Sequence, residues 1–349
     1  MIGFPQYPAF QVFLAIVMSM SLTMSLLPAW IRLLRFRQIG QQVRADGPQR
    51  HLVKQGTPTM GGVVILFAIL VTMLLLTRAR STAELTNVVL IAFATLACGL
   101  VGLVDDASKL VKERSLGLKP NAKMVMLTFI AVVFTLVAVN YGNISPVVTI
   151  PLFRSFDLGV LTTTIGDSVT GFKIPWLYLL FVFLLMVGMA NSVNLTDGLD
   201  GLAGGTVMIA MVVMAVISYR VDQLNTALIA AAACGACVGF LWFNSYPAMI
   251  FMGDTGSLAF GGAFAAIAVV TKTEIVSLLV GGVFVLEAIS VIIQVAYFKL
   301  TQKRVFLMSP IHHHFEQKGW SETTIVIRFW IITALSAAVG FAWFFSQST

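Results

Sequence analysis

Residues 176–219, WLYLLFVFLLMVGMANSVNLTDGLDGLAGGTVMIAMVVMAVISY, decide what kind of fold this chain has. Two apolar runs flank one short polar stretch, Asn194–Gly201. An α-helix needs about 17–25 mostly apolar residues to cross the hydrocarbon core of a bilayer, and each run is about that long. An ordinary turn between helices needs one Asn or Gly, whereas this stretch carries Asp197, Gly198, Asp200 and Gly201. The segment therefore predicts two membrane-spanning helices joined by a binding loop.

The rest of the chain has the composition of a membrane protein. Of its 349 residues, 58% are hydrophobic and only 11% are charged, whereas a soluble surface needs roughly a quarter or more charged residues. A net charge of +7 could indicate a nucleic-acid partner. Membrane proteins, however, keep Lys and Arg in cytoplasmic loops, so we expect no nucleic acid. Cys98, Cys234 and Cys237 lie in apolar runs and are interpreted as packing residues, because a redox pair needs an accessible thiolate.

Ten segments are long and apolar enough to cross a membrane: about 9–34, 57–77, 85–104, 122–140, 175–193, 200–219, 223–242, 255–271, 275–298 and 325–346. No soluble domain fits between them. We therefore predict one all-α polytopic membrane domain, residues 1–349, with ten transmembrane helices. The connection 141–174 contains the alternating stretches Val-Val-Thr-Ile and Val-Leu-Thr-Thr-Thr-Ile, which indicate a small β-hairpin on the external side.

The distribution of basic residues predicts the orientation. The first apolar run has no basic residue ahead of it, which is typical of a retained helix that starts outside. The cytoplasmic loops are then about 32–56, 105–123, 194–200, 243–254 and 299–328. They hold 16 of the 22 Lys and Arg; the other six are Arg78, Arg80, Arg154, Lys173, Arg220 and Lys272. This split satisfies the positive-inside rule and predicts periplasmic termini, with the acidic motifs at the cytoplasmic face of a bacterial inner membrane.

Three acidic motifs gather on that predicted face. Asp105 and Asp106 close an apolar run, where the dipole of the helix C-terminus favours cations rather than carboxylates. Mg²⁺ is usually held by one or two carboxylates together with substrate phosphates, so we interpret this pair as a metal or phosphate site. Asp254 opens a later helix and could be only its N-cap. The two other acidic motifs on the same face favour a metal ligand instead.

Three further features carry chemical possibilities. His312, His313 and His314 are adjacent in sequence, so on a helix they point about 100° apart and cannot share one metal; phosphate contact or support of an active site fits better. Lys54 precedes residues 56–62, where a helix N-terminus would suit phosphate but the glycines equally suit close helix packing. Glu287 is the only charged residue well inside a predicted span, and a functional and a structural role remain equally open.

Taken together and in order, these motifs resemble the polyprenyl-phosphate N-acetylhexosamine-1-phosphate transferases. The resemblance runs through Val-Gly-Leu-Val-Asp-Asp, Asn-Leu-Thr-Asp-Gly-Leu-Asp-Gly-Leu-Ala, Gly-Phe-Leu-Trp-Phe-Asn and Met-Gly-Asp-Thr-Gly-Ser-Leu-Ala, and covers nearly the whole chain. Gly-Thr-Pro-Thr-Met-Gly-Gly and Pro-Ile-His-His-His-Phe-Glu resemble the branch of that family that acts on UDP-MurNAc-pentapeptide. A related transferase that uses UDP-GlcNAc is the alternative within the family.

The resemblance implies transfer of phospho-MurNAc-pentapeptide from UDP-MurNAc-pentapeptide to undecaprenyl phosphate, giving lipid I and UMP in peptidoglycan biosynthesis. It also implies Mg²⁺ as cofactor, membrane lipid as surroundings and a homodimer. Asp254 matches the principal Mg²⁺ ligand, and the implied catalytic residues are Asp105, Asp106, Asp254, His312, His313 and His314. The implied substrate-binding residues are Lys54, Thr59, Lys109, Lys123, Asn194, Asp197, Gly198, Leu199, Asp200, Asn244 and Phe251, with Lys119 as an alternative to Lys123.

Two chemical routes are open at this point. A phosphate monoester is mostly a dianion near neutral pH, which favours direct attack by the lipid phosphate with Asp105 orienting it. A covalent phosphoryl-aspartate at Asp105 or Asp106 is the alternative. A secondary transporter is a rival function of another class, but transporter sites lie near the bilayer midplane, where this chain places only Glu287.

Overall fold

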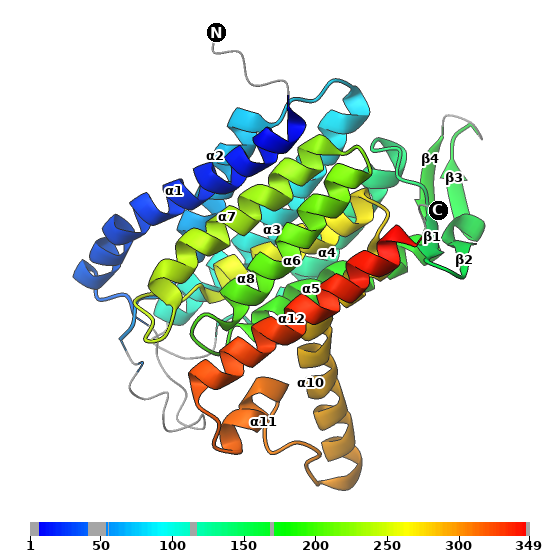
Figure 1. Ribbon diagram of the computed structural model, residues 1–349. Helices are drawn as coiled ribbons and strands as arrows, with labels where there is room; N and C mark the ends of the chain where they lie inside the picture. The colour runs from blue at the N-terminus through cyan, green and yellow to red at the C-terminus, as the bar shows by residue number, and fades with distance from the viewer. Residues whose placement is uncertain (1–6, 41–53, 55, 112–116, 168–170, 347–349) are drawn as a thin grey trace.

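The computed structural model describes residues 7–40, 54, 56–111, 117–167 and 171–346, and it is almost wholly helical (Figure 1). Its helices are α1 (Pro8–Phe36), α2 (Gly62–Leu76), α3 (Thr82–Val111), α4 (Pro120–Asn140), α5 (Trp176–Thr196), α6 (Leu202–Arg220), α7 (Leu224–Asn244), α8 (Gly253–Val270), α9 (Glu274–Val280), α10 (Gly282–Thr301), α11 (Ile311–Gln317) and α12 (Glu322–Phe345). Each of the ten predicted segments contains a helix. The predicted loop 32–56 lies largely outside the described residues.

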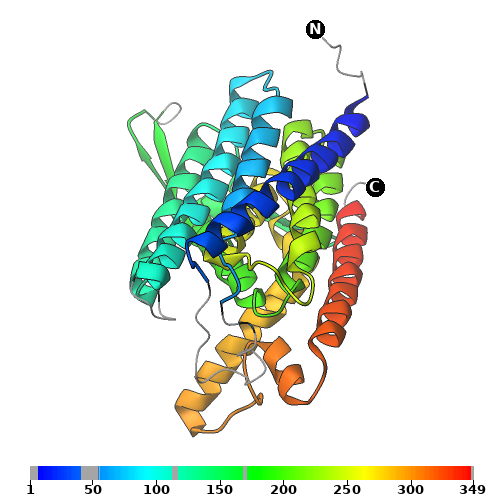
Figure 2. The ribbon, with the colours of Figure 1, turned by 90° about the vertical axis from the view of Figure 1, so that its left-hand side faces the viewer.

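Nine of the helices in the described part of the chain are long and apolar enough to cross a membrane. The helix α2, with 15 residues, is shorter than that length. The predicted segment 275–298 is broken into α9 and α10 at Gly281 and Gly282, residues of low helix propensity. Beyond this break α10 leaves the bundle, and Figure 2 shows α10 and α11 at the end opposite the N-terminus and the strands. The structure is thus that of a polytopic helical membrane protein.

The connection predicted as one β-hairpin forms two hairpins. The strand β1 (Val147–Ile150) pairs antiparallel with β2 (Arg154–Asp157), and β3 (Thr162–Ile165) pairs with β4 (Phe172–Pro175); the 3₁₀ turn η2 (Leu158–Val160) separates them. Both stretches singled out in the sequence, at β1 and β3, are strands. They pair with their own sequence neighbours rather than with each other.

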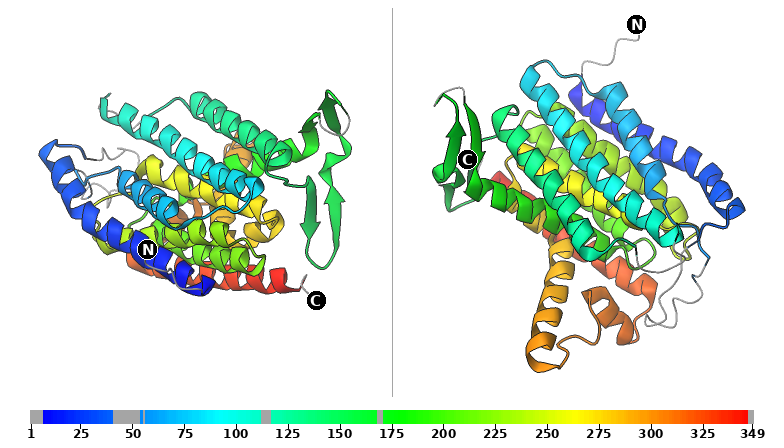
Figure 3. Two further views of the ribbon diagram at one scale, coloured as in Figure 1. Left: turned by 90° about the horizontal axis from the view of Figure 1, so that it is seen from above. Right: turned by 180° about the vertical axis from the view of Figure 1, so that it is seen from behind.

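The helix α8 forms the centre of the bundle. Seen from above in Figure 3, it lies between α3 on one side and α6 and α7 on the other, and all residues from Thr255 to Val270 are buried. Small residues allow this close packing: a β-carbon on Gly102 of α3 would lie 2.1 Å from the backbone oxygen of Asp254. Gly62 of α2 has the same role, because a β-carbon on it would lie 2.1 Å from the amide nitrogen of Gly256.

The interpretation of the three cysteines as packing residues is confirmed by their burial. Cys98 on α3 and the pair Cys234 and Cys237 on α7 are all free thiols with buried side chains. A β-carbon on Gly262 of α8 would lie 2.7 Å from the sulfur of Cys98. The thiols thus fill space between helices that meet at α8 and α7.

Candidate active site

The acidic motifs lie on two helices that pack against each other. Asp105 and Asp106 are in the last turns of α3, which continues to Val111, so the predicted helix end at residue 104 was wrong. The reason is local: Lys109 pairs with Asp105 one turn away, and a cation near a helix C-terminus offsets the helix dipole. Asp254 is in the first turn of α8. The contact between α3 and α8 therefore brings the three carboxylates together.

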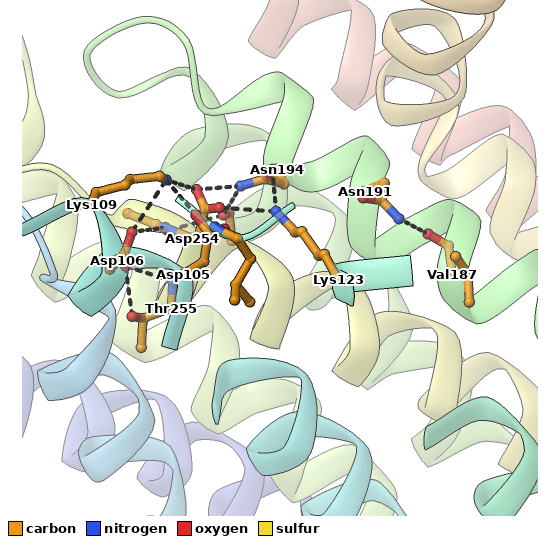
Figure 4. A network of polar contacts seen from close by, with 12 residues as sticks. Asp105, Asp106, Lys109, Lys123, Val187, Asn191, Asn194, Asp254 and Thr255 are labelled. Carbon is orange, nitrogen blue, oxygen red and sulfur yellow. Dashed lines mark hydrogen bonds and ion pairs between the residues drawn. The ribbon is translucent and has the colours of Figure 1, made fainter. Parts of the chain in front are cut away.

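One ammonium group lies among these three carboxylates. Carboxylate oxygens of Asp105, Asp106 and Asp254 lie within 4.8 Å of one another. The Nζ of Lys109 is 2.7 Å from Asp105 Oδ2, 3.0 Å from Asp254 Oδ1 and 3.6 Å from Asp106 Oδ1 (Figure 4). Clustered carboxylates repel one another unless a cation is present, so the cluster is arranged around positive charge.

The neighbours of Asp254 come from two further helices. Lys123, in the first turn of α4, places Nζ 2.9 Å from Asp254 Oδ2 and 3.2 Å from Asn194 Oδ1. Asn194, near the end of α5, donates its amide to Asp254 Oδ1 at 3.0 Å and to Ser257 Oγ at 2.8 Å. Of the two lysines that the sequence offered for this position, the structure brings Lys123 to the cluster.

Asp106 caps α8 from another helix. Its Oδ1 accepts the backbone N–H of Asp254 at 3.1 Å, and its Oδ2 accepts the N–H of Thr255 at 3.0 Å and the hydroxyl of Thr255 at 2.7 Å. First-turn amides have no partner within their own helix, and a carboxylate is a favourable acceptor for them. Asp254 itself is therefore not the cap, and its carboxylate is left for the cluster. The sequence contained Thr255 in the motif but gave no sign of this role.

Gly253 allows the backbone to turn into α8 close to Asp106. Its φ of 75° lies in the left-handed region, which side chains disfavour. A β-carbon there would also lie 2.7 Å from Asp106 Oδ2 and 3.1 Å from the hydroxyl oxygen of Thr59. Thr59 thus lies next to the start of α8. Residues 58–62 run alongside this start, since Gly61 and Gly62 donate backbone hydrogen bonds of 2.9 Å to Phe251 and Met252.

A second polar network lies along the loop after α5. Lys54 Nζ donates to Asp200 Oδ1 at 2.7 Å and to Glu322 at the start of α12. Burial alone would lower the pKa of Lys54, but its hydrogen bonds to Asp200 and Glu322 outweigh burial and raise it. Asn244 accepts the N–H of Gly201 at 3.0 Å and donates to the oxygen of Ile250 at 2.9 Å. Glu322 was missed because an acidic residue in a first helical turn is common without a further role.

The remaining predicted residues are held by contacts with several neighbouring segments. Leu199 is buried in a small apolar cluster with residues of α6, α10 and α12, so its side chain packs the loop against these helices. Phe251 is half-buried, and its N–H donates to the oxygen of Pro58 at 2.8 Å. His312 pairs with Glu287, and His314 accepts the N–H of Leu307 through Nδ1 at 3.1 Å. The structure thus places the His312 and His314 side chains against supporting residues.

Asp197 is a second carboxyl group of this loop, besides Asp200. It follows the last residue of α5 and is partly buried. Burial, together with the negative charges of Asp254 and Asp106, raises the pKa of Asp197 from 3.8 to about 7. The carboxyl group is therefore held partly protonated near neutral pH, close to the cluster.

This shift predicts a pH-dependent stability in the presence of a chelator. An Asp with a raised pKa binds its proton more tightly in the folded state, so it costs stability as pH rises through that pKa. We expect the unfolding free energy of wild type to fall as pH rises from about 5.5 to 7.5. This fall should be about 1–2 kcal/mol larger than the change in Asp197→Asn over the same interval. Thermal or denaturant unfolding in detergent measures this. Identical pH profiles for the two proteins would contradict the prediction.

Residues 87–272 match the family described as glycosyl transferase family 4, and residues 54–66 match signature 1 of phospho-N-acetylmuramoyl-pentapeptide-transferase. Curated relatives of that name are similar over nearly their full length. The Bacillus subtilis (strain 168) relative is 44% identical over 326 residues, which cover 93% of this chain and 95% of the relative. The Corynebacterium jeikeium (strain K411) relative is 42% identical over 360 residues, which cover 97% of this chain and 98% of the relative. The chain belongs to the phospho-N-acetylmuramoyl-pentapeptide-transferase family, within glycosyl transferase family 4.

Proposed function

We propose that the chain carries out its family's reaction at the cluster of Asp105, Asp106 and Asp254. The reaction transfers phospho-MurNAc-pentapeptide from UDP-MurNAc-pentapeptide to undecaprenyl phosphate and gives lipid I and UMP. The observation that carries this placement is the contact of Lys109 with all three carboxylates. Phosphoryl transfer depends mainly on positioning and on neutralising charge, and this cluster offers both signs of charge within a few ångströms.

The cluster fits Mg²⁺ as cofactor. Its donors are carboxylate oxygens, the ligands that this hard cation prefers, and the ammonium of Lys109 already lies where they converge. Asp254 is the principal ligand in this proposal, because its side chain is 16% exposed against 5% for Asp105 and 3% for Asp106. When bound there, Mg²⁺ would neutralise the diphosphate and stabilise the departing UMP.

The protein side chains divide the remaining work. Lys123 and Asn194 hold the Asp254 carboxylate from two sides. Asp106 is committed to the start of α8, which leaves Asp105 to orient the acceptor phosphate or to take up a residual proton. Asp105 Oδ1 accepts the N–H of Leu118 at 2.8 Å, which fixes the orientation of that carboxylate. This division favours direct attack by the lipid phosphate.

The loop Asn194–Gly201 is the proposed nucleoside site. Lys54, Asp200 and Asn244 fasten its end to neighbouring segments, while Asp197 and Gly198 remain in its middle. Phe251, placed by the strand-like pairing of residues 58–62 with 251–252, is the proposed aromatic neighbour of the uracil. The histidines His313 and His314 on α11 complete the proposed substrate-binding surface.

We propose the membrane arrangement from charge and from the site together. Ten crossing segments, with α2 extended by the residues before it and with α9 and α10 forming one broken crossing, leave both termini and the hairpins periplasmic. The site then lies at the cytoplasmic face, where a water-soluble nucleotide and the phosphate of a lipid acceptor meet at headgroup level. The positive-inside distribution supports this orientation. The family resemblance supports a homodimer.

Purified protein is expected to release UMP only when both substrates and Mg²⁺ are present. Because the dianionic acceptor attacks directly, rapid quench without undecaprenyl phosphate should show no stoichiometric UMP burst. UDP-GlcNAc in place of UDP-MurNAc-pentapeptide is the substrate control and should release no UMP. A burst accompanied by radiolabel on the protein would demonstrate the covalent route, and turnover with UDP-GlcNAc would contradict the substrate assignment.

A further inference from the structure

Glu287 and His312 form a buried pair beneath the proposed nucleoside loop. Glu287 lies on α10 and His312 on α11, and both side chains are 0% exposed. The Nδ1 of His312 is 3.0 Å from Glu287 Oε1. A carboxylate isolated in such surroundings is costly, so the imidazole supplies the polar partner that Glu287 needs. The pair joins the last cytoplasmic-side segment of the chain to α10.

The opposite edge of the His312 ring, which carries Nε2, is directed at the loop. The Nε2 atom is buried and has no hydrogen-bond partner, and a β-carbon on Gly198 would lie only 2.4 Å from it. No side chain fits between the loop and the imidazole. The backbone of Gly198 therefore contacts the ring directly. The position of the ring limits how closely the loop can approach α10.

Two more residues of the same C-terminal segment hold the loop. Glu322 accepts the N–H of Asp200 at 2.7 Å, and Trp330 donates its indole N–H to the oxygen of Gly201 at 3.2 Å. With His312 against Gly198, three contacts along the loop come from α11 and α12. Of these three residues, His312 is the one whose side chain is bonded to α10, through Glu287.

We propose that Glu287 is a positioning residue: by fixing the ring of His312 it sets the height of the loop Asn194–Gly201 and so the affinity for the nucleotide substrate. This inference rests on the proposed assignment of that loop to the nucleoside. Glu287 touches neither substrate nor the acidic cluster in this arrangement. Its effect reaches the reaction through His312 and Gly198, which distinguishes it from a merely structural residue that maintains folding.

The test is a kinetic comparison of Glu287→Gln with wild type in detergent. The substitution keeps the shape of the side chain and removes its charge. Loss of a charged hydrogen bond is worth about 1.5–3 kcal/mol, so we expect KM for UDP-MurNAc-pentapeptide to rise about tenfold or more, with KM for undecaprenyl phosphate unchanged. His312→Asn should show the same selective rise. The double variant should be no worse than His312→Asn, because both substitutions remove one interaction.

Ser290→Ala is the matched control. Ser290 is buried three residues further along α10 and donates to the backbone oxygen of Glu287 at 2.7 Å, so its loss perturbs the helix but not the carboxylate. It should leave both KM values unchanged. A fall in kcat for Glu287→Gln, without a selective rise in KM for UDP-MurNAc-pentapeptide, would overturn the inference.

A variant of the loop itself separates the two proposals. If Asp197→Asn raises KM for the nucleotide substrate and Glu287→Gln does not, the loop assignment stands and the positioning role fails. If neither variant raises that KM, both the loop assignment and the positioning role are wrong. Additive effects of Glu287→Gln and His312→Asn would also contradict a shared interaction.

Discussion

Asp254→Ala is expected to lower the turnover number about 10³-fold or more while the protein still folds. The change removes the most exposed carboxylate of the cluster and leaves Lys109 and Lys123 without a shared acceptor. Loss of a metal ligand forfeits several kcal/mol of transition-state stabilisation, and each factor of ten corresponds to about 1.4 kcal/mol. UMP release at saturating substrates and Mg²⁺ measures the effect.

Asp254→Asn is the companion variant, since it keeps the size of the side chain and removes only its charge. It should lose activity to a similar extent. Gel filtration in detergent should show that both variants remain monodisperse, because Asp106 rather than Asp254 caps α8. Substantial Mg²⁺-dependent activity in either variant would show that Asp254 is not the principal ligand.

Gly102→Ala is expected to have the largest effect on stability, lowering the unfolding free energy by about 2–3 kcal/mol. The added methyl group would lie 2.1 Å from the backbone oxygen of Asp254 and 2.5 Å from the amide nitrogen of Thr255. These are backbone atoms of a buried helix and cannot turn away as a flexible side chain can. The helices α3 and α8 must separate, and the cluster they carry must open, so activity falls with stability.

Gly188→Ala is the control for this substitution. Gly188 lies within α5, and a β-carbon there would meet no atom within 4 Å. Alanine has the higher helix propensity, so the melting temperature of this variant should equal or exceed that of wild type. If the two alanine variants lower the melting temperature equally, close packing of α3 against α8 is not the cause.

Hydropathy predicted where the helices lie because a bilayer requires long apolar runs, and each predicted segment contains a helix. It did not predict where they end. The boundary at residue 104 was wrong because apolar residues mark the bilayer, whereas α3 continues beyond it through the Asp105–Lys109 pair. The break at Gly281 was also missed, since the apolar run continues through it.

The site was predicted as a set of residues, but not as a division of roles. Residue types alone cannot distinguish Asp105 from Asp106, which are neighbours in sequence. Their difference comes from tertiary contacts: Asp106 bonds to the start of α8, whereas Asp105 bonds to Leu118. The support that Glu322 provides to the loop likewise depends on how α12 packs, which no local pattern records.

Because Cys98, Cys234 and Cys237 are buried, the wild-type chain should not react with thiol-labelling reagents. A water-soluble maleimide modifies only thiols that it can reach. A single cysteine introduced at an exposed position, such as Arg154 in the hairpins or Lys318 after α11, would then be the only reactive one. Labelling such variants in intact cells and in opened membranes would report which side of the bilayer each end of the bundle faces, with no native thiol removed first.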